Sequence, residues 1–165
     1  MRNDKAPAEL FIDTTYLLPF FQVPIKVKDF NLSDFKAFIA NLSKVHVSEL
    51  SVYEAKAKLL RLSEIHRPYE KALRAFSENL DILRMDEKFV FQTYTGEADR
   101  LFNQIHATVK RLDAFDLIIL SEAFMVGQLL TEDTEILSLR NSDEFARNPL
   151  FNSIRVMSWK DAMPS

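Results

Sequence analysis

The stretch DLIILSEAFMVGQLLTED, residues 116–133, predicts a buried helix followed at once by a buried strand. Its first half is largely apolar and belongs to the helix 114–126, which Gly127 ends because glycine readily adopts the left-handed backbone that closes many helices. Residues 128–130 then form a short strand, and Asp133 follows at its tip. A buried helix leading into a buried strand is typical of a parallel sheet covered by helices.

Short apolar strands alternate with longer helices on both sides of this stretch. The alternation indicates βαβ units, so we predict a three-layer α/β/α fold with a central parallel sheet of four to five short strands. No internal repeat, low-complexity segment or linker interrupts the chain, so residues 1–165 are expected to form one domain. We expect strands at 10–12, 45–47, 82–83, 128–130 and 154–157, and helices at 35–42, 49–62, 68–79, 87–110, 114–126 and 134–139.

The composition excludes several classes of protein. The absence of cysteine excludes disulfides, thiolate zinc sites and cysteine nucleophiles. The two glycines are too few for a P-loop or a dinucleotide-binding loop. No apolar run is long enough to span a membrane and Met1–Glu9 has no signal-peptide core, so we expect a cytoplasmic protein without a membrane partner. With a net charge of −3, the chain would need a local basic patch or a metal ion to hold a nucleic acid.

The predicted elements bring four acidic residues to one edge of the sheet. Asp13 follows the first strand and Asp133 follows the fourth, and ligands of open α/β sheets bind beyond the carboxyl ends of the strands. Glu54 and Asp116 lie early in helices that leave the same edge. All four side chains are therefore expected to converge on one pocket.

Four carboxylates in one pocket repel one another unless protons or cations neutralise them. Oxygen ligands without histidine or cysteine favour Mg²⁺ or Mn²⁺ over zinc. Such ions can lower the pKa of a bound water, hold a phosphate oxygen and stabilise a leaving oxygen. The arrangement therefore predicts a hydrolase that acts on phosphodiesters.

Each of the four acids also has a purely structural explanation. Asp13 could cap the helix that follows it, and Asp133 could be an ordinary turn residue. Glu54 could be a solvated acid paired with a lysine one helical turn later, an interaction worth only about 0.3–0.5 kcal/mol. Asp116 could form a capping box with Asp113, although its apolar neighbours require a partner for the charge.

At three places the sequence resembles the PIN-domain family, which includes the toxin nucleases of VapBC-type toxin–antitoxin pairs. LFIDTT (10–15) is similar to the family's opening strand and first aspartate. VSELSVYE (47–54) is similar to its second motif, a strand, a serine and a glutamate on the helix. Residues 116–133 are similar to its aspartate-led helix, glycine and strand ending in Thr-x-Asp. The resemblance spans most of the chain, from Leu10 to about Trp159.

The resemblance implies a parallel sheet flanked by helices and an endoribonuclease that cleaves single-stranded RNA with Mg²⁺ or Mn²⁺. It assigns the core metal ligands to Asp13, Glu54 and Asp116, with Asp133 as a fourth acid. Thr131 would orient Asp133 or a bound water. An antitoxin protein as partner and a homodimer are implied in the same way.

Two stretches depart from the family pattern. The segment 22–44 is longer than a minimal PIN toxin needs. Glu122 stands in a part of the helix where the family prefers small residues. Neither departure removes an expected ligand.

Binding of RNA also needs groups that hold its phosphates and bases. An excess of basic residues follows Glu54 and could hold the phosphate backbone, although a solvated helix face explains it equally well. Phenylalanines are most simply core residues, but exposed ones could stack on bases. The basic residues are Lys56, Lys58, Arg61, Arg67, Lys71 and Arg74, and the phenylalanines considered are Phe35, Phe38, Phe76 and Phe102.

Two other functions compete with the nuclease. The fold could bind RNA or a protein partner with little or no catalysis, but a scaffold does not need four acids at one edge of its sheet. A phosphatase of the haloacid dehalogenase type also begins with an aspartate after a strand. That chemistry needs a second aspartate two residues later, where this chain has Thr15, so we reject it.

Overall fold

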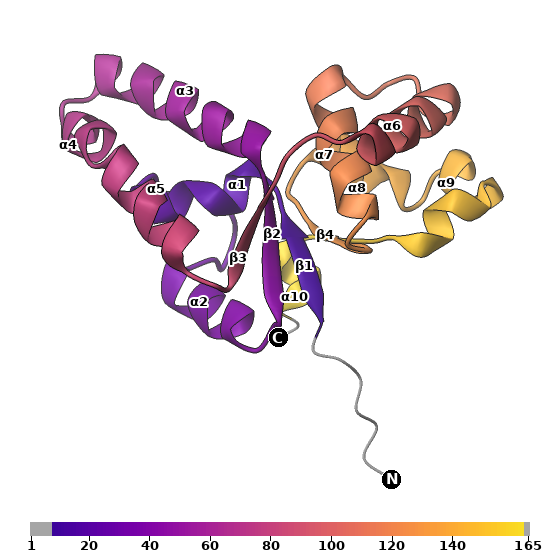
Figure 1. Ribbon diagram of the computed structural model, residues 1–165, viewed down its shortest axis with the longest axis horizontal. Coiled ribbons are helices and arrows are strands. Elements are labelled where there is room, and N and C mark those ends of the chain that lie inside the picture. The colour runs from indigo at the N-terminus through magenta and orange to yellow at the C-terminus, as the bar shows by residue number, and fades with distance from the viewer. Residues whose placement is uncertain (1–7, 164–165) are drawn as a thin grey trace, which may run out of the picture.

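Five strands form one parallel sheet in the computed structural model, which describes residues 8–163. The strands are β1 (Glu9–Ile12), β2 (Lys44–Ser48), β3 (Phe89–Gln92), β4 (Gln128–Leu130) and β5 (Arg155–Met157). Their order across the sheet is β3-β2-β1-β4-β5 (Figure 1). The prediction that Met1–Glu9 has no signal-peptide core falls mostly on residues 1–7, which lie outside the described residues.

Helices cover both faces of the sheet. One side carries α1 (Thr14–Leu17), η1 (Leu18–Phe21), α2 (Leu32–Ala40), α3 (Glu49–Ile65), α4 (Pro68–Arg74) and α5 (Phe76–Met85). The other side carries α6 (Gly96–Thr108), α7 (Ala114–Phe124), α8 (Thr134–Leu139), α9 (Asp143–Arg147) and η2 (Pro149–Ser153). The last helix, α10 (Trp159–Ala162), packs into the core on the side of α1. The architecture is therefore the predicted three-layer α/β/α fold. None of the helices within residues 8–163 has the length and apolar character needed to cross a membrane.

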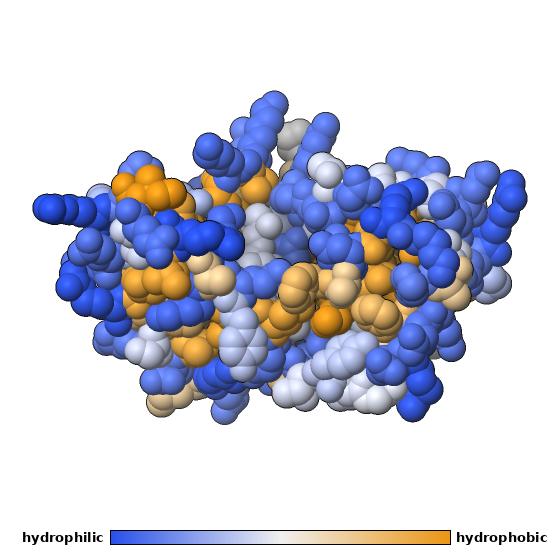
Figure 2. All heavy atoms as spheres, turned by 90° about the horizontal axis from the view of Figure 1, so that it is seen from above, coloured by the Kyte–Doolittle hydropathy of each residue, from blue (hydrophilic) through white to orange (hydrophobic). Residues whose placement is uncertain are grey.

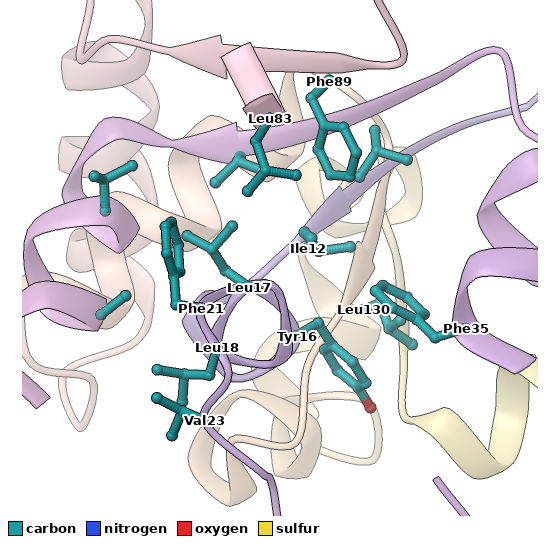
Figure 3. Packing of buried hydrophobic residues seen from close by; sticks show 14 of the residues in the cluster. Ile12, Tyr16, Leu17, Leu18, Phe21, Val23, Phe35, Leu83, Phe89 and Leu130 are labelled. Atoms are coloured by element: carbon teal, nitrogen blue, oxygen red, sulfur yellow. The ribbon is translucent and has the colours of Figure 1, made fainter. Parts of the chain in front are cut away.

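The strand side chains alternate between two hydrophobic cores, one on each face of the sheet. Leu10 and Ile12 of β1 enter the core on the side of α1, while Phe11 enters the core on the side of α7. Leu130 and Leu129 of β4 divide in the same way, because successive side chains of a strand point to opposite faces. Figure 3 shows the first of these cores, where residues of β1, β3 and β4 meet residues of α1, η1, α2 and α5.

The chain connections create a switch point between β1 and β4. From β1 the chain proceeds outward to β2 and β3, and after β3 it returns to place β4 on the other side of β1. Ile12 and Leu130 are partners in the register, and the Asp13 N–H donates to the Leu130 carbonyl over 3.2 Å. The residues that follow these two strands therefore lie side by side at the carboxyl edge, where α/β sheets bind ligands.

The prediction of the third strand is wrong. Residues 82–83 lie inside α5, where one side chain is buried and the other is exposed, as in an amphipathic helix. The strand is β3, which lies within the predicted helix 87–110, and the helix itself begins only at Gly96. The run Phe89-Val-Phe has the aromatic and β-branched character of a strand, but charged residues on its N-terminal side masked that signal.

Several predicted helix ends are confirmed, and others are shifted by two or three residues. Ser48 caps α3 by accepting the Leu50 N–H over 3.1 Å. Gly127 has a φ of 87°, the left-handed conformation that the sequence predicted for the end of α7. The predicted helix 68–79 is in fact two helices, α4 and α5, which meet at Ala75.

The long segment 22–44 completes the core on the side of α1. Val23, Phe35 and Ile39 are buried there. The backbone carbonyl of Asp29 accepts the indole N–H of Trp159 over 3.2 Å. The additional length therefore joins α10 to the rest of this layer.

Candidate active site

A pocket of about 350 Å³ opens beyond the carboxyl ends of β1 and β4. Its volume lies at the lower end of the range of small-molecule sites, about 300–1,000 Å³. All four acids that the sequence placed at this edge line it, namely Asp13, Glu54, Asp116 and Asp133. No lysine, arginine or histidine of the described residues is part of its lining. The fold thus collects acidic side chains from four separate parts of the chain into one cavity.

Asp13 is buried, with 8% of its surface exposed, and both of its carboxylate oxygens are held. Oδ1 accepts the Thr15 N–H over 2.9 Å, and Oδ2 accepts a hydrogen bond from the Thr131 hydroxyl. Burial raises the pKa of Asp13 to about 6, although these hydrogen bonds oppose the rise, and the charge of Asp133 adds to it. The ionised form of Asp13 is therefore destabilised in this position.

Asp116 lies in the first turn of α7 and is partly exposed. Burial raises its pKa to about 6, and the charges of Asp133, Asp113 and Glu54 raise it further, whereas the Asp113 backbone N–H lowers it. Repulsion between carboxylates has this effect only over short distances. Asp116 therefore shares one electrostatic environment with acids that lie far from it in the sequence.

Hydrogen bonds also fix the other two acids. Glu54 accepts a hydrogen bond from the Thr14 hydroxyl of α1. Asp133 accepts a backbone N–H of α8 over 2.9 Å and so caps that helix. Thr131 is fully buried and links two acids, because its hydroxyl donates to Asp13 and accepts the Asp133 N–H over 3.0 Å.

The structural explanations of the four acids coexist with their position in the pocket. Asp13 and Asp133 do cap the helices that follow them, and both still line the cavity. Asp113 caps α7 by accepting the Asp116 N–H over 2.9 Å, which leaves Asp116 at the pocket wall. Glu54 bonds a threonine of α1 rather than the lysine one turn later in its own helix.

The sequence did not point to several other residues of this pocket. Glu132 is a fifth acid in its lining. Its Oε1 accepts hydrogen bonds from the Tyr16 hydroxyl and from the backbone N–H of Trp159. Thr14 holds Glu54, and Phe115 forms part of the wall. Each of them lies next to or near a predicted acid in the sequence. Their roles depend on contacts between distant segments, which no local pattern reveals.

Glu122, the departure from the family pattern in α7, lies outside this pocket. It is 1% exposed, and its Oε2 has no hydrogen-bond partner among the described residues. Burial raises the pKa of Glu122, and the Ser48 hydroxyl opposes this rise. Burial therefore favours the neutral carboxyl group at this position.

The chemistry of the pocket suits a hard cation, but the side chains do not meet at one point. Its polar lining consists of carboxylates and threonine hydroxyls, the oxygen ligands that Mg²⁺ prefers. Within residues 8–163, however, no group of three or more acidic or histidine side chains is arranged to hold a metal ion. The predicted convergence is thus present at the level of the pocket, and metal binding stays a prediction.

Comparison with solved structures identifies a similar fold. The chain is similar to a chain in the crystal structure of VapBC2 from Rickettsia felis bound to a DNA fragment from their promoter, with a TM-score of 0.58 and 14% sequence identity. The match covers 92% of this chain and 98% of that chain. No protein-family model and no curated protein matches the sequence. The fold is therefore an α/β fold of the PIN-like type.

Proposed function

We propose that this chain is a Mg²⁺- or Mn²⁺-dependent endoribonuclease that hydrolyses phosphodiester bonds of single-stranded RNA. The observation that carries the proposal is the acidic pocket, in which the pKa values of Asp13 and Asp116 are both raised to about 6. Such a cluster destabilises the folded protein unless cations or protons neutralise it, so a purely structural role does not explain it. The similarity in fold to a VapBC2 chain supports a nuclease of the toxin–antitoxin type.

The acids and threonines of the pocket would each have a role in this chemistry. The four predicted acids would supply the oxygen ligands, and the bound ion would polarise the phosphate and lower the pKa of a water molecule. Thr131 and Thr14 hold the carboxylates of Asp13 and Glu54 by hydrogen bonds.

Basic residues on α3 support the proposal that the chain holds an RNA backbone. Lys58 and Arg61 follow Glu54 at i+4 and i+7, so they share its face of the helix. Both are exposed, and neither forms an ion pair with another residue of the described range. Lys56 instead lies over the Phe76 ring, with its Nζ 4.7 Å from the ring centroid. We propose that phosphates beside the cleaved bond contact Lys58 and Arg61.

We also propose that the chain acts as a homodimer in the cytoplasm and has an antitoxin protein as its partner. The similar VapBC2 chain comes from an assembly of VapB and VapC, which supports a protein partner. The homodimer and the cytoplasmic location rest on the sequence resemblance and composition alone. Light scattering of the purified chain tests the dimer directly.

The nuclease is tested by cleavage of labelled single-stranded RNA in Mg²⁺, in Mn²⁺ and in EDTA. Wild-type protein is expected to cut with either ion and not in EDTA, and the double variant Asp13→Asn/Asp116→Asn is expected to lose at least 100-fold in rate, about 2.7 kcal/mol. Asp143→Asn is the matched control, because Asp143 is an exposed aspartate on α9 that does not line the pocket. Equal cutting by the double variant would refute the assignment of the site.

A binding module is the second candidate, and one observation favours it. The acids of the pocket are not arranged to hold a metal ion as they stand. If neither ion supports cutting and neither binds, while RNA still binds, this reading replaces the nuclease.

A further inference from the structure

The four phenylalanines considered for base stacking from the sequence are buried or partly buried in the structure. Phe35 and Phe76 are buried in the core on the side of α1. Phe38 and Phe102 pack, partly buried, against the two cores. Two of these four rings are therefore buried, and the other two are only partly exposed.

Phe115 differs from these residues in its exposure and in its packing. It is 54% exposed and lines the acidic pocket next to Asp116. It belongs to neither core and to neither set of residues packed around the cores. Its backbone is fixed all the same, because its N–H donates to the Asp113 cap over 2.8 Å. The fold thus holds an exposed ring at a defined place on the wall of the pocket.

Two buried isoleucines line the pocket with Phe115, while its polar lining consists of acids and threonines. Ile119 follows Phe115 one helical turn later and lines the cavity, as does Ile136 of α8. Figure 2, which views the molecule of Figure 1 from above, shows apolar side chains reaching the surface among charged ones. One cavity therefore combines an exposed aromatic ring with acids that suit a metal-held phosphate.

We propose that the ring of Phe115 stacks on the base of a nucleotide next to the cleaved phosphodiester. This inference rests on the proposed function, since it names the residue by which that site selects its substrate. A base can expose its face to Phe115 only when it is unpaired and unstacked, which restricts cleavage to single-stranded segments. Every base has an aromatic face, so the contact selects strandedness rather than sequence.

The test combines a modified substrate with a modified enzyme. RNA oligomers of one sequence each carry a single abasic nucleotide at a different position. For wild-type protein, the abasic site at one position beside the cut is expected to raise KM about tenfold, in the range reported for loss of one stacked base. Phe115→Ala is expected to raise KM about tenfold on intact RNA, with no further rise from that abasic site. Phe115→Trp should restore the wild-type pattern, because the indole stacks as well.

Tyr53→Ala is the matched control. Tyr53 is 70% exposed and adjacent to Glu54, but it does not line the pocket. This variant should behave like the wild type on every substrate. If wild-type protein cuts intact and abasic RNA with the same KM at all positions, stacking is refuted while the nuclease stands.

A second readout applies even if the proposed nuclease fails. The fluorescence of Phe115→Trp is titrated with intact and abasic oligomers, and the signal of the buried Trp159 is subtracted by using wild-type protein. Quenching by intact RNA that the abasic oligomer does not produce would support stacking without any cleavage. Equal fluorescence with both oligomers would overturn it.

Discussion

At the scale of single residues, Asp13 shows how one side chain serves both fold and site. One oxygen caps α1 and the other accepts the Thr131 hydroxyl, so the carboxylate cannot turn away from the pocket. The buried bond between Thr131 and Asp13 joins the ends of β1 and β4, and the Thr131 hydroxyl also accepts the Asp133 N–H. Hydrogen bonds just beyond the two strands therefore fix the position of these acids.

Asp116 is expected to reduce the stability of the metal-free protein at neutral pH. Its pKa is raised from 3.8 to about 6, so the folded state binds the proton more tightly than the unfolded state. The free energy of unfolding therefore falls as the pH rises from about 4 through 6, and the penalty is complete above 6. We expect Asp116→Asn to raise Tm in EDTA at pH 7.5 by about 2–4 °C, the shift that about 1 kcal/mol produces in a chain of this size, after allowance for partial exposure.

Thermal melts of wild type and variant from pH 4.5 to 8 measure this effect. The difference in Tm should shrink as the pH falls through 6. The exposed Asp143→Asn should not reproduce the pattern. A difference that does not depend on pH would mean that burial and the neighbouring acids do not raise the pKa of Asp116 to about 6.

At the scale of elements, α3 links the acidic pocket to the surface. Its N-terminal part carries Glu54, and Lys58 and Arg61 continue the same face away from the pocket. A strand of RNA with one phosphate at the acids could lie along this face. The helix would then supply both an acidic ligand and the positive charge that neutralises the backbone.

The charge of this face predicts the salt dependence of RNA binding. Lys58→Glu and Arg61→Glu are each expected to weaken binding and to reduce the slope of log K against log salt by about 0.7 for each phosphate contact that is lost. Fluorescence anisotropy between about 50 and 200 mM salt measures the slope. Lys36→Glu on α2 makes the same change of charge away from the pocket, and its slope should equal that of the wild type. If all three variants give the slope of the wild type, the RNA binds away from this face of α3.

At the scale of the whole molecule, binding of a divalent ion should stabilise the fold, because only the folded chain brings the four acids together. At a concentration of ion about 100 times its Kd, the stabilisation is about 2.7 kcal/mol. We therefore expect Mg²⁺ or Mn²⁺ to raise Tm by about 5–10 °C. Differential scanning fluorimetry measures the shift, which Asp13→Asn/Asp116→Asn should abolish and Asp143→Asn should retain. A shift that survives in the double variant would mean that the ion binds at another site.

The sequence by itself determined much of the local structure and the identity of four of the five acids in the pocket. Asp113, Ser48 and Gly127 fixed helix ends, because capping depends on a side chain and its nearest backbone groups. Apolar runs that end in Asp13 and Thr131 fixed two strands and their tips. Where local signals conflicted, the prediction failed, and β3 was hidden because an aromatic run follows directly on charged residues.

The tertiary structure alone decided which residues share the pocket. The acids that follow β1 and β4 and those on α3 and α7 line one pocket only because the chain crosses back after β3 and places β4 beside β1, an order that depends on contacts between distant segments. Glu132 is held by Tyr16 and Trp159 through the same long-range packing. Exposure, too, follows from the complete fold, and it separates Phe115 from the phenylalanines of the core. Sequence patterns report what a residue does within one or two helical turns, and a site shared by four elements depends on the packing of the whole chain.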